Sequence, residues 1–189
     1  MESALIVSST DKSTALITEL LNEAVIKHIA VLDTAGEARR MLVERDFDVV
    51  IINAPLPDES GEDLARHIAV KTVSQVILVV KSEFLEEVSA VCENDGVLTI
   101  SKPMEKAVFW SALMLARSAQ NRIKRILAEN AKLKQKIEDI RIVDRAKYIL
   151  ITRLNLTEQE AHRFIEKQAM DMRTTKRSIA EGILKTYGN

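Results

Sequence analysis

Length, composition and charge already exclude several classes of protein. The chain has 189 residues, of which 47% are hydrophobic and 29% are charged, and its apolar runs are far shorter than the ~20 residues that a bilayer span requires. The single cysteine, Cys92, excludes an internal disulfide framework, and the N-terminus lacks the basic and apolar blocks of a secretion signal. We therefore expect a cytoplasmic protein in which Cys92 is a small core residue.

The net charge of −1 conceals two parts of opposite sign. Residues 1–118 carry 11 Lys and Arg against 19 Asp and Glu, a net −8, whereas residues 119–189 carry 16 against 9, a net +7. The acidic part is not suited to nucleic acid. The basic part can attract the phosphates of RNA or DNA, although a solvated charged helix has a similar composition.

The first part of the chain alternates short apolar runs with segments of helical period. Apolar runs of four or five residues indicate strands that are buried on both faces, so the sheet is expected to be parallel and covered by helices. We predict an α/β flavodoxin-like (βα)5 domain over residues 1–118. Its predicted strands are residues 4–7, 29–32, 49–52, 76–80 and 97–100.

In such a sheet, functional residues lie at the carboxyl ends of the strands. The third strand is followed by "NAPLPDESG", with Pro57 and Gly61 four and eight residues after Asn53, and the fifth strand is followed by "SKP", which contains Lys102 and Pro103. This arrangement resembles the receiver domain of bacterial response regulators, a family that usually holds the peptide bond between this lysine and proline in cis.

The groups with which a receiver accepts a phosphate are largely replaced. That chemistry needs a carboxylate nucleophile, further carboxylates to hold Mg²⁺, a hydroxyl and a lysine. By the resemblance, Asn53 stands at the nucleophile and Val80 at the switching Ser or Thr. Ser8 and Ser9 stand at the acidic pair, and only Lys102 is retained. An amide cannot form an acyl phosphate, so we predict a pseudo-receiver with no phosphoacceptor, no metal and no cofactor.

The charged residues near this pocket have simpler explanations. Asp11 and Asp58 stand at a helix start and in a loop, where capping or solvated carboxylates are common. Lys81 and Lys102 could bind an anion, but pairing with Asp58 or Glu59 is the favoured interpretation. Because the site lacks the groups that accept a phosphate, we expect a regulatory protein or a ligand to control the domain.

Residues 119–139 are predicted to be a coiled-coil linker. A seven-residue register can be written from Ala116 over about four heptads, with Asn130 as its polar member. A polar seam residue costs stability but favours two parallel strands, so we expect a parallel homodimer. The alternative is a helix that folds back on the receiver. The register places Ala116, Ile123, Asn130 and Ile137 at a, and Ala119, Ile126, Leu133 and Ile140 at d; the predicted dimer contacts run from Ile123 to Ile140.

Residues 140–189 are expected to form an all-α module of three helices, too small for an enzyme with a buried site. Thr157 and Glu160 form a capping-box pattern that starts the second helix near Glu158. Thr174 or Thr175 can cap the third helix, and Gly188 can stop it. The predicted buried face of the second helix comprises Ala161, Phe164, Ile165, Gln168 and Ala169.

The segment "RAKYILITRLNLTEQEAHRFIEKQAMDMRTTKRSIAEGIL" resembles an ANTAR domain, the RNA-binding module of bacterial transcription antiterminators. Two departures are Tyr148, where a glycine is common, and Asn155, where His or Gly occurs. The residues that carry the resemblance are Ala146, Lys147, Leu150, Thr157, Glu158, Ala161, Ala169, Met170, Arg173, Ile179 and Ala180.

The resemblance implies a non-enzymatic regulator of transcription antitermination that is dimeric and grips paired hairpins in a leader RNA, so that a terminator cannot form. Lys and Arg would anchor phosphates beside unstacked loop bases, while the alanines allow close approach or packing. Each basic residue alone could equally be solvated. The predicted RNA-binding residues are Arg145, Ala146, Lys147, Arg163, Lys167, Ala169, Met170, Arg173, Lys176 and Arg177.

Two other functions stay open at this point. A DNA-binding response regulator is less favoured, because we find no helix-turn-helix pattern with a Gly-containing turn. A protein-interaction scaffold would use the coil and the sheet, and its basic end would only be solvated. His28, His67 and His162 have no metal-ligand spacing.

Overall fold

The computed structural model describes residues 1–187 and comprises two compact units, Met1–Arg125 and the residues from Ile126 onward. Gly188, the predicted stop of the last helix, lies outside the described residues. The elements in chain order are β1 (Ser3–Val7), α1 (Asp11–Glu23), β2 (His28–Leu32), α2 (Ala35–Glu44), β3 (Val49–Asn53), α3 (Glu62–Lys71), β4 (Gln75–Lys81), the 3₁₀ turn η1 (Ser82–Phe84), α4 (Leu85–Cys92), the 3₁₀ turn η2 (Glu93–Asp95), β5 (Leu98–Lys102), α5 (Lys106–Leu154), α6 (Glu158–Asp171) and α7 (Lys176–Tyr187).

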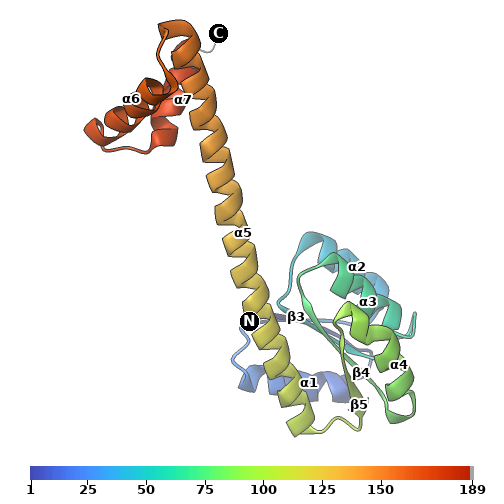
Figure 1. Cartoon of the computed structure of the whole chain (residues 1–189). Helices are drawn as coiled ribbons and strands as arrows, with labels where there is room; N and C mark the ends of the chain where they lie inside the picture. The colour runs from blue at the N-terminus through green and yellow to red at the C-terminus, as the bar shows by residue number, and fades with distance from the viewer. Residues whose placement is uncertain (188–189) are drawn as a thin grey trace. The chain divides into compact units, whose positions relative to one another are not determined.

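All five predicted strands are present, and they form one parallel sheet in the order β2-β1-β3-β4-β5 (Figure 1). This is the flavodoxin-like arrangement that the alternating pattern predicted. The observed strands differ from the predicted ones by one or two residues at their ends: pairing extends past the apolar run in every strand, and β5 begins one residue later than predicted. In the register, Asn53 at the end of β3 lies beside Val79 of β4.

The sheet separates two apolar layers because successive strand residues point to opposite faces. Val50 and Ile52 of β3 pack with α2, α3 and α4, in a layer that also contains the fully buried Cys92. Val49 and Ile51 pack on the other face with α1 and the first turns of α5. Figure 1 shows these helices on the two sides of the sheet. The prediction that Cys92 is a core residue is confirmed.

Helix α5 begins in the first unit, where it packs on the sheet, and ends in the second unit. Phe109, Leu113 and Ala116 are buried against the sheet. Placing Ala116 on the coiled-coil seam was therefore wrong, because the sheet already covers its methyl group. Among residues 1–187, every helix is too short or too rich in charge for a bilayer crossing.

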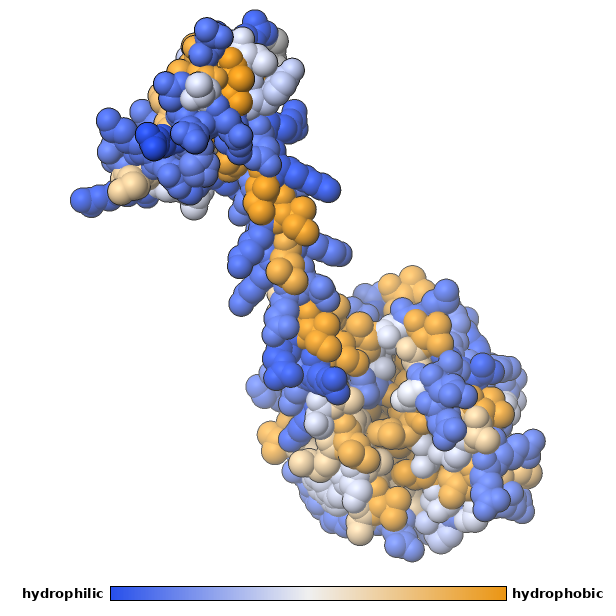
Figure 2. Space-filling model, in the orientation of Figure 1, coloured by the Kyte–Doolittle hydropathy of each residue, from blue (hydrophilic) through white to orange (hydrophobic). Residues whose placement is uncertain are grey.

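From Ile126 to Ile140 the apolar side chains of α5 are exposed in the single chain, and Figure 2 shows them as apolar surface along this helix. Asn130 is exposed among them, whereas Ile123 is half-buried. We call the stripe formed by these side chains the α5 stripe. Its exposed large members are Ile126, Leu127, Leu133, Ile137 and Ile140.

The second unit is built where the end of α5 meets α6 and α7. Ala146, Ala161 and Ala180, one from each helix, are fully buried, and their small side chains let the three backbones approach closely. Leu150, Ile165 and Ile183 complete this core.

Local signals position the three helices of this unit. The predicted capping box is confirmed: the Thr157 hydroxyl accepts from the Glu160 amide at 3.3 Å, and the Glu160 carboxylate accepts from the Thr157 amide at 2.8 Å. Thr175, rather than Thr174, caps α7 by accepting from the Ser178 amide at 3.2 Å. Asn155 has φ +53°, a left-handed conformation that Asn tolerates.

Candidate functional site

The carboxyl ends of β1 and β3 carry a neutral, buried pair of polar side chains. The Asn53 amide nitrogen donates to the Ser8 hydroxyl at 3.0 Å, and these residues are only 3% and 1% exposed. The Thr10 amide also donates to the Ser8 hydroxyl at 3.4 Å. The position that would hold a phosphorylatable carboxylate is therefore filled by an amide that is already hydrogen-bonded and shielded from solvent.

No carboxylate compensates for this replacement. Ser9 and Asp11 are exposed, and Asp58 is turned toward the start of α2, where its two oxygens accept from the Ala35 and Gly36 amides at 2.9 Å each. These backbone hydrogen bonds hold the pKa of Asp58 below its ordinary value. Within residues 1–187, there is no cluster of three or more His, Cys, Asp or Glu that could hold a metal ion.

The expected pairing of Lys81 and Lys102 with Asp58 or Glu59 was wrong. Lys102 donates to the Ala54 carbonyl, and Lys81 lies 3.5 Å from Glu83. Both acidic residues are already engaged, because Asp58 caps α2 and Glu59 pairs with Arg39 at 2.8 Å.

Lys102 is the one phosphorylation-site group retained from the receiver pattern. Burial, followed by the charge of Lys81, lowers its pKa. Its bond to Pro103 is cis, as the receiver resemblance implied. Val80, at the position of the switching hydroxyl, is buried and lines a hollow of about 260 Å³ with Phe84 and Val88.

The opposite edge of the sheet carries a buried charge that the sequence patterns did not single out. Asp48 precedes β3 and accepts from Lys124 at 2.7 Å, from Gln120 at 3.3 Å and from the Glu2 and Ser3 amides. Burial alone would raise its pKa, but these hydrogen bonds hold the pKa of Asp48 well below its usual range. Asp48 thus joins β1 to α5. The only sequence signal is an acidic residue directly before an apolar strand.

In the second unit, the predicted basic residues divide into two groups. Four of them, Arg145, Arg163, Lys167 and Arg173, are exposed and form no ion pair with any carboxylate of residues 1–187. The other three are paired within the unit: Lys147 with Asp144 (2.8 Å) and Glu158 (3.3 Å), Lys176 with Glu166, and Arg177 with Asp139 and Glu181 (2.7 Å each).

The two predicted alanines and the methionine differ in exposure. Ala146 is fully buried and Ala169 nearly so, which fits the close approach or packing expected of these alanines. Met170, by contrast, is 78% exposed and lines a surface hollow with Ala169 and Arg173. Arg173 has φ +48°, a conformation that favours Gly or Asn.

Two exposed aromatic side chains were not predicted as site residues. Phe164 was expected on the buried face of α6 but is 40% exposed, whereas Ala161, Ile165 and Ala169 are the buried residues of this helix. Tyr148, where the family resemblance leads one to expect glycine, is 68% exposed beside Arg145 in a shallow hollow. The departure of Tyr148 from the family pattern is the feature of the sequence that could have identified it as a site residue.

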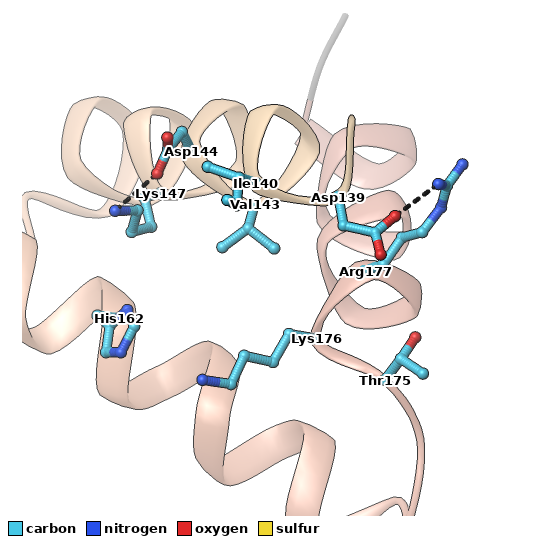
Figure 3. A pocket seen from close by; sticks show the side chains of 9 residues that line it. All are labelled: Asp139, Ile140, Val143, Asp144, Lys147, His162, Thr175, Lys176 and Arg177. Carbon is cyan, nitrogen blue, oxygen red and sulfur yellow. Dashed lines mark hydrogen bonds and ion pairs between the residues drawn. The ribbon is translucent and has the colours of Figure 1, made fainter. Parts of the chain in front are cut away.

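The paired basic residues surround a cavity of about 360 Å³ between α5, α6 and α7 (Figure 3). Ile140 and Val143 of α5 provide an apolar wall, and His162 lies across from them. Figure 3 shows Lys176 extending toward His162, and both of these side chains contact Glu166. The remaining lining residues are Asp139, Asp144, Lys147, Thr175 and Arg177.

Comparison with known proteins agrees with both parts of the chain. Residues 4–114 match the response regulator receiver domain family, and residues 131–184 match the ANTAR domain family. The transcriptional regulatory protein PdtaR, from two strains of Mycobacterium tuberculosis, is 28% identical over 172 residues, which are 91% of this chain and 84% of that protein.

Solved structures resemble the first unit. The signal receiver domain of an HD domain-containing protein from Pseudomonas fluorescens Pf-5 is 25% identical, with a TM-score of 0.58 over 65% of this chain and 91% of that chain. A CheY-like receiver domain protein from Methanospirillum hungatei JF-1 has a TM-score of 0.57 at 20% identity, over 65% of this chain and 98% of that chain. The receiver match covers more than half of the sequence, and the chain therefore belongs to the response regulator family, with a receiver domain followed by an ANTAR domain.

Proposed function

We propose that this response regulator is an RNA-binding antitermination factor that acts as a parallel dimer and is controlled without phosphorylation of the receiver. It binds two hairpins of a leader RNA and so prevents formation of a terminator. The observation that carries the proposal is the set of exposed, unpaired cations on the ANTAR domain, a domain that is associated with RNA binding.

The unpaired cations are suitably placed for a nucleic-acid backbone. Arg163 and Lys167 are one turn apart on α6 and share a face, and Arg173 follows at the end of the helix. Arg173 occupies a left-handed backbone conformation that costs about 1 kcal/mol or more for a residue other than glycine. Backbone strain of this kind occurs at functional positions, and it supports a functional role for the Arg173 side chain. Met170 adds exposed apolar surface beside these charges for contact with unstacked bases.

The α5 stripe supports the dimer. Its exposed apolar residues recur at seam spacing, with Asn130 between Ile126 and Leu133, and a second copy of α5 would cover them. The dimer contacts we propose are Ile123, Ile126, Asn130, Leu133, Ile137 and Ile140. Two joined modules raise the affinity for a two-hairpin RNA because the second hairpin binds at a high effective concentration.

The receiver supports control without phosphate. Asn53 and Ser8 hydrogen-bond to each other, and residues 1–187 contain no cluster of three or more His, Cys, Asp or Glu that could hold Mg²⁺. We propose that residues 1–118 act as a pseudo-receiver, residues 119–139 as the coil and residues 140–189 as the RNA-binding part. A protein or a ligand, rather than a phosphodonor, then changes the state of the receiver.

A gel-shift titration tests this function. The whole chain is titrated against a two-hairpin leader RNA and a matched DNA duplex, with and without acetyl phosphate and Mg²⁺. We expect RNA-selective binding that the phosphodonor leaves unchanged. Preference for the duplex would favour a DNA-binding regulator, and absence of binding at every salt concentration would favour a protein scaffold. Binding that requires the donor would mean that another residue accepts the phosphate.

A further inference from the structure

The open cavity between α5, α6 and α7 has a lining unlike that of a phosphate site. Each of its basic residues, Lys147, Lys176 and Arg177, is paired with a carboxylate, and the carboxylates of Asp139 and Asp144 face the same space. The carboxylates in this lining repel a phosphate. The exposed cations of α6 form no ion pair with a carboxylate of residues 1–187 and can bind a phosphate more readily. A lining that mixes acceptors and donors over an apolar wall is suited to the edge of a nucleic-acid base.

Asp139 has the clearest capacity for such a contact. Its Oδ1 accepts from Arg177 at 2.7 Å and from Gln135 at 2.8 Å, and these hydrogen bonds lower the pKa of Asp139, so that it stays ionised. Its Oδ2 accepts no hydrogen bond from the described part of the chain. Figure 3 shows the Asp139 carboxylate beside Arg177, to which one of its oxygens is hydrogen-bonded.

The size and the walls of the cavity also fit one base. About 360 Å³ is at the low end of the ~300–1,000 Å³ range of small-ligand pockets. Val143 can contact the face of a flat ring, while the Lys147 and Lys176 ammonium groups can each donate to a ring nitrogen or a carbonyl. Because Lys has three N–H donors, an ion pair does not exhaust either group.

We propose that this cavity holds one unstacked base of the bound RNA loop, a base with an exocyclic amino group that donates to Oδ2 of Asp139. This inference rests on the proposed RNA-binding function and adds a specificity-determining residue to it. Adenine, cytosine and guanine carry such a group, and uracil does not, so the cavity discriminates against uracil. The exposed cations of α6 hold the phosphates, and the cavity reads the base.

The test removes single amino groups from the RNA. In the leader RNA of the gel shift, each loop adenosine is replaced by purine riboside, each guanosine by inosine and each cytidine by its 4-deamino analogue, one position at a time. With the wild-type chain, we expect one loop position at which removal of the amino group weakens binding roughly ten- to a hundredfold, as for a lost hydrogen bond to a charged group. Absence of any such position overturns the proposal without requiring a protein variant.

Three variants then assign that dependence to Asp139. Asp139→Ala should bind unmodified RNA more weakly than wild type and should no longer distinguish the amino-deleted RNA. Electrostatics alone predicts the opposite change, because removal of a negative charge raises the affinity for RNA. Glu138→Ala removes the same charge from the neighbouring exposed position, and it should keep the dependence and bind equally well or more tightly.

Arg177→Ala breaks the same α5–α7 ion pair as Asp139→Ala but keeps the acceptor, so its ratio of affinities for amino-bearing and amino-deleted RNA should match that of wild type. Circular dichroism checks that both variants keep their helices. If Asp139→Ala retains the amino dependence, the inference is wrong while the proposed function stands. If the wild-type chain binds no RNA, the proposed function itself fails.

Discussion

The receiver and the ANTAR domain place their charges in opposite ways. In the receiver, the edge that performs chemistry in this fold is occupied by the neutral Asn53–Ser8 pair, and the buried charge, Asp48, lies at the other edge against α5. In the ANTAR domain, the core is apolar and built around alanines, and every charged side chain is at the surface. In the proposed function, the first domain holds the start of α5 through Asp48, and the second domain contacts RNA through its exposed charges.

The largest expected effect comes from separating the two ANTAR domains of a dimer. Leu133→Gln combined with Ile137→Gln removes two apolar side chains from the α5 stripe and keeps good helix formers. We expect a monomer in sedimentation and an affinity for two-hairpin RNA that is roughly a hundredfold or more weaker, because avidity is lost. Affinity for a single hairpin should be unchanged.

The matched control for the stripe is Arg125→Gln with Lys132→Gln, which changes two exposed residues at c positions of the register, away from the seam and its flanking e and g positions. It should leave the oligomeric state unchanged and lower RNA affinity only through lost charge. If the double variant and wild type both sediment as dimers, another surface joins the two copies. If both sediment as monomers, the chain does not dimerise.

A second test compares the unpaired cations of the ANTAR domain with exposed cations of the receiver. Replacing Arg163, Lys167 and Arg173 by Gln should weaken RNA binding by on the order of ten- to a hundredfold at moderate salt. The slope of log affinity against log salt should fall by about one for each side chain that touches a phosphate. The measurement is a salt series of binding titrations, which separates phosphate contacts from other losses.

The control for the cations is a charge-matched triple variant in the receiver, in which Lys12, Arg40 and Lys71, all exposed, become Gln. Its salt slope should equal that of wild type. An equal reduction in both triple variants would mean that net charge alone, and no particular face, determines binding.

Asp48→Asn tests whether Asp48 fixes the start of helix α5 on the receiver. The substitution weakens the hydrogen bonds from Lys124, Gln120 and two backbone amides, so we expect a loss of about 2–3 kcal/mol in the free energy of unfolding. The single tryptophan, Trp110, packs against the receiver core, and its fluorescence during urea unfolding reports on this domain. Asp46→Asn, the same change at an exposed position two residues earlier, should cost little.

The pH dependence of unfolding gives Asp48 a second readout. The pKa of Asp48 is lowered in the folded chain, so its stabilisation is fully present above the ordinary Asp pKa of about 4 and is lost as the pH falls below that value. Wild type should therefore lose stability on acidification by more than Asp48→Asn does. If the free energy of unfolding changes with pH in the same way in both proteins, Asp48 does not stabilise the receiver in the proposed manner.

The parts of the molecule that were predictable from sequence are those with a local cause. The apolar runs indicate strands because they are buried on both faces, and Thr157 with Glu160 starts α6 because the capping box involves only neighbouring residues. Asp48 and the cavity beside Asp139 escaped prediction because their partners lie far away in the sequence: Lys124 for the first and Arg177 for the second. The expected pairing of Lys102 with Asp58 was wrong for the same reason, because Asp58 accepts from the amides of Ala35 and Gly36 at the start of α2.

The smallest predicted effect concerns the local stability of the ANTAR domain. Thr157→Ala removes the cap of α6 and should cost about 1 kcal/mol, seen as faster hydrogen exchange in the first turns of α6. Thr152→Ala is the matched control: its hydroxyl donates to the Tyr148 carbonyl within α5, where a helix former such as Ala is at least as good.

The Thr157 amide and hydroxyl lower the pKa of Glu160, so the contribution of the cap is present above the ordinary Glu pKa of about 4.3 and fades as the pH falls below it. The difference between wild type and Thr157→Ala should therefore shrink on acidification, while Trp110 fluorescence reports an unchanged receiver in both proteins. A receiver that loses stability together with α6 would contradict the division of the chain into two separately stabilised domains. An α6 that exchanges as slowly in the variant as in wild type would mean that the alanine-built core, and not the cap, holds the start of this helix.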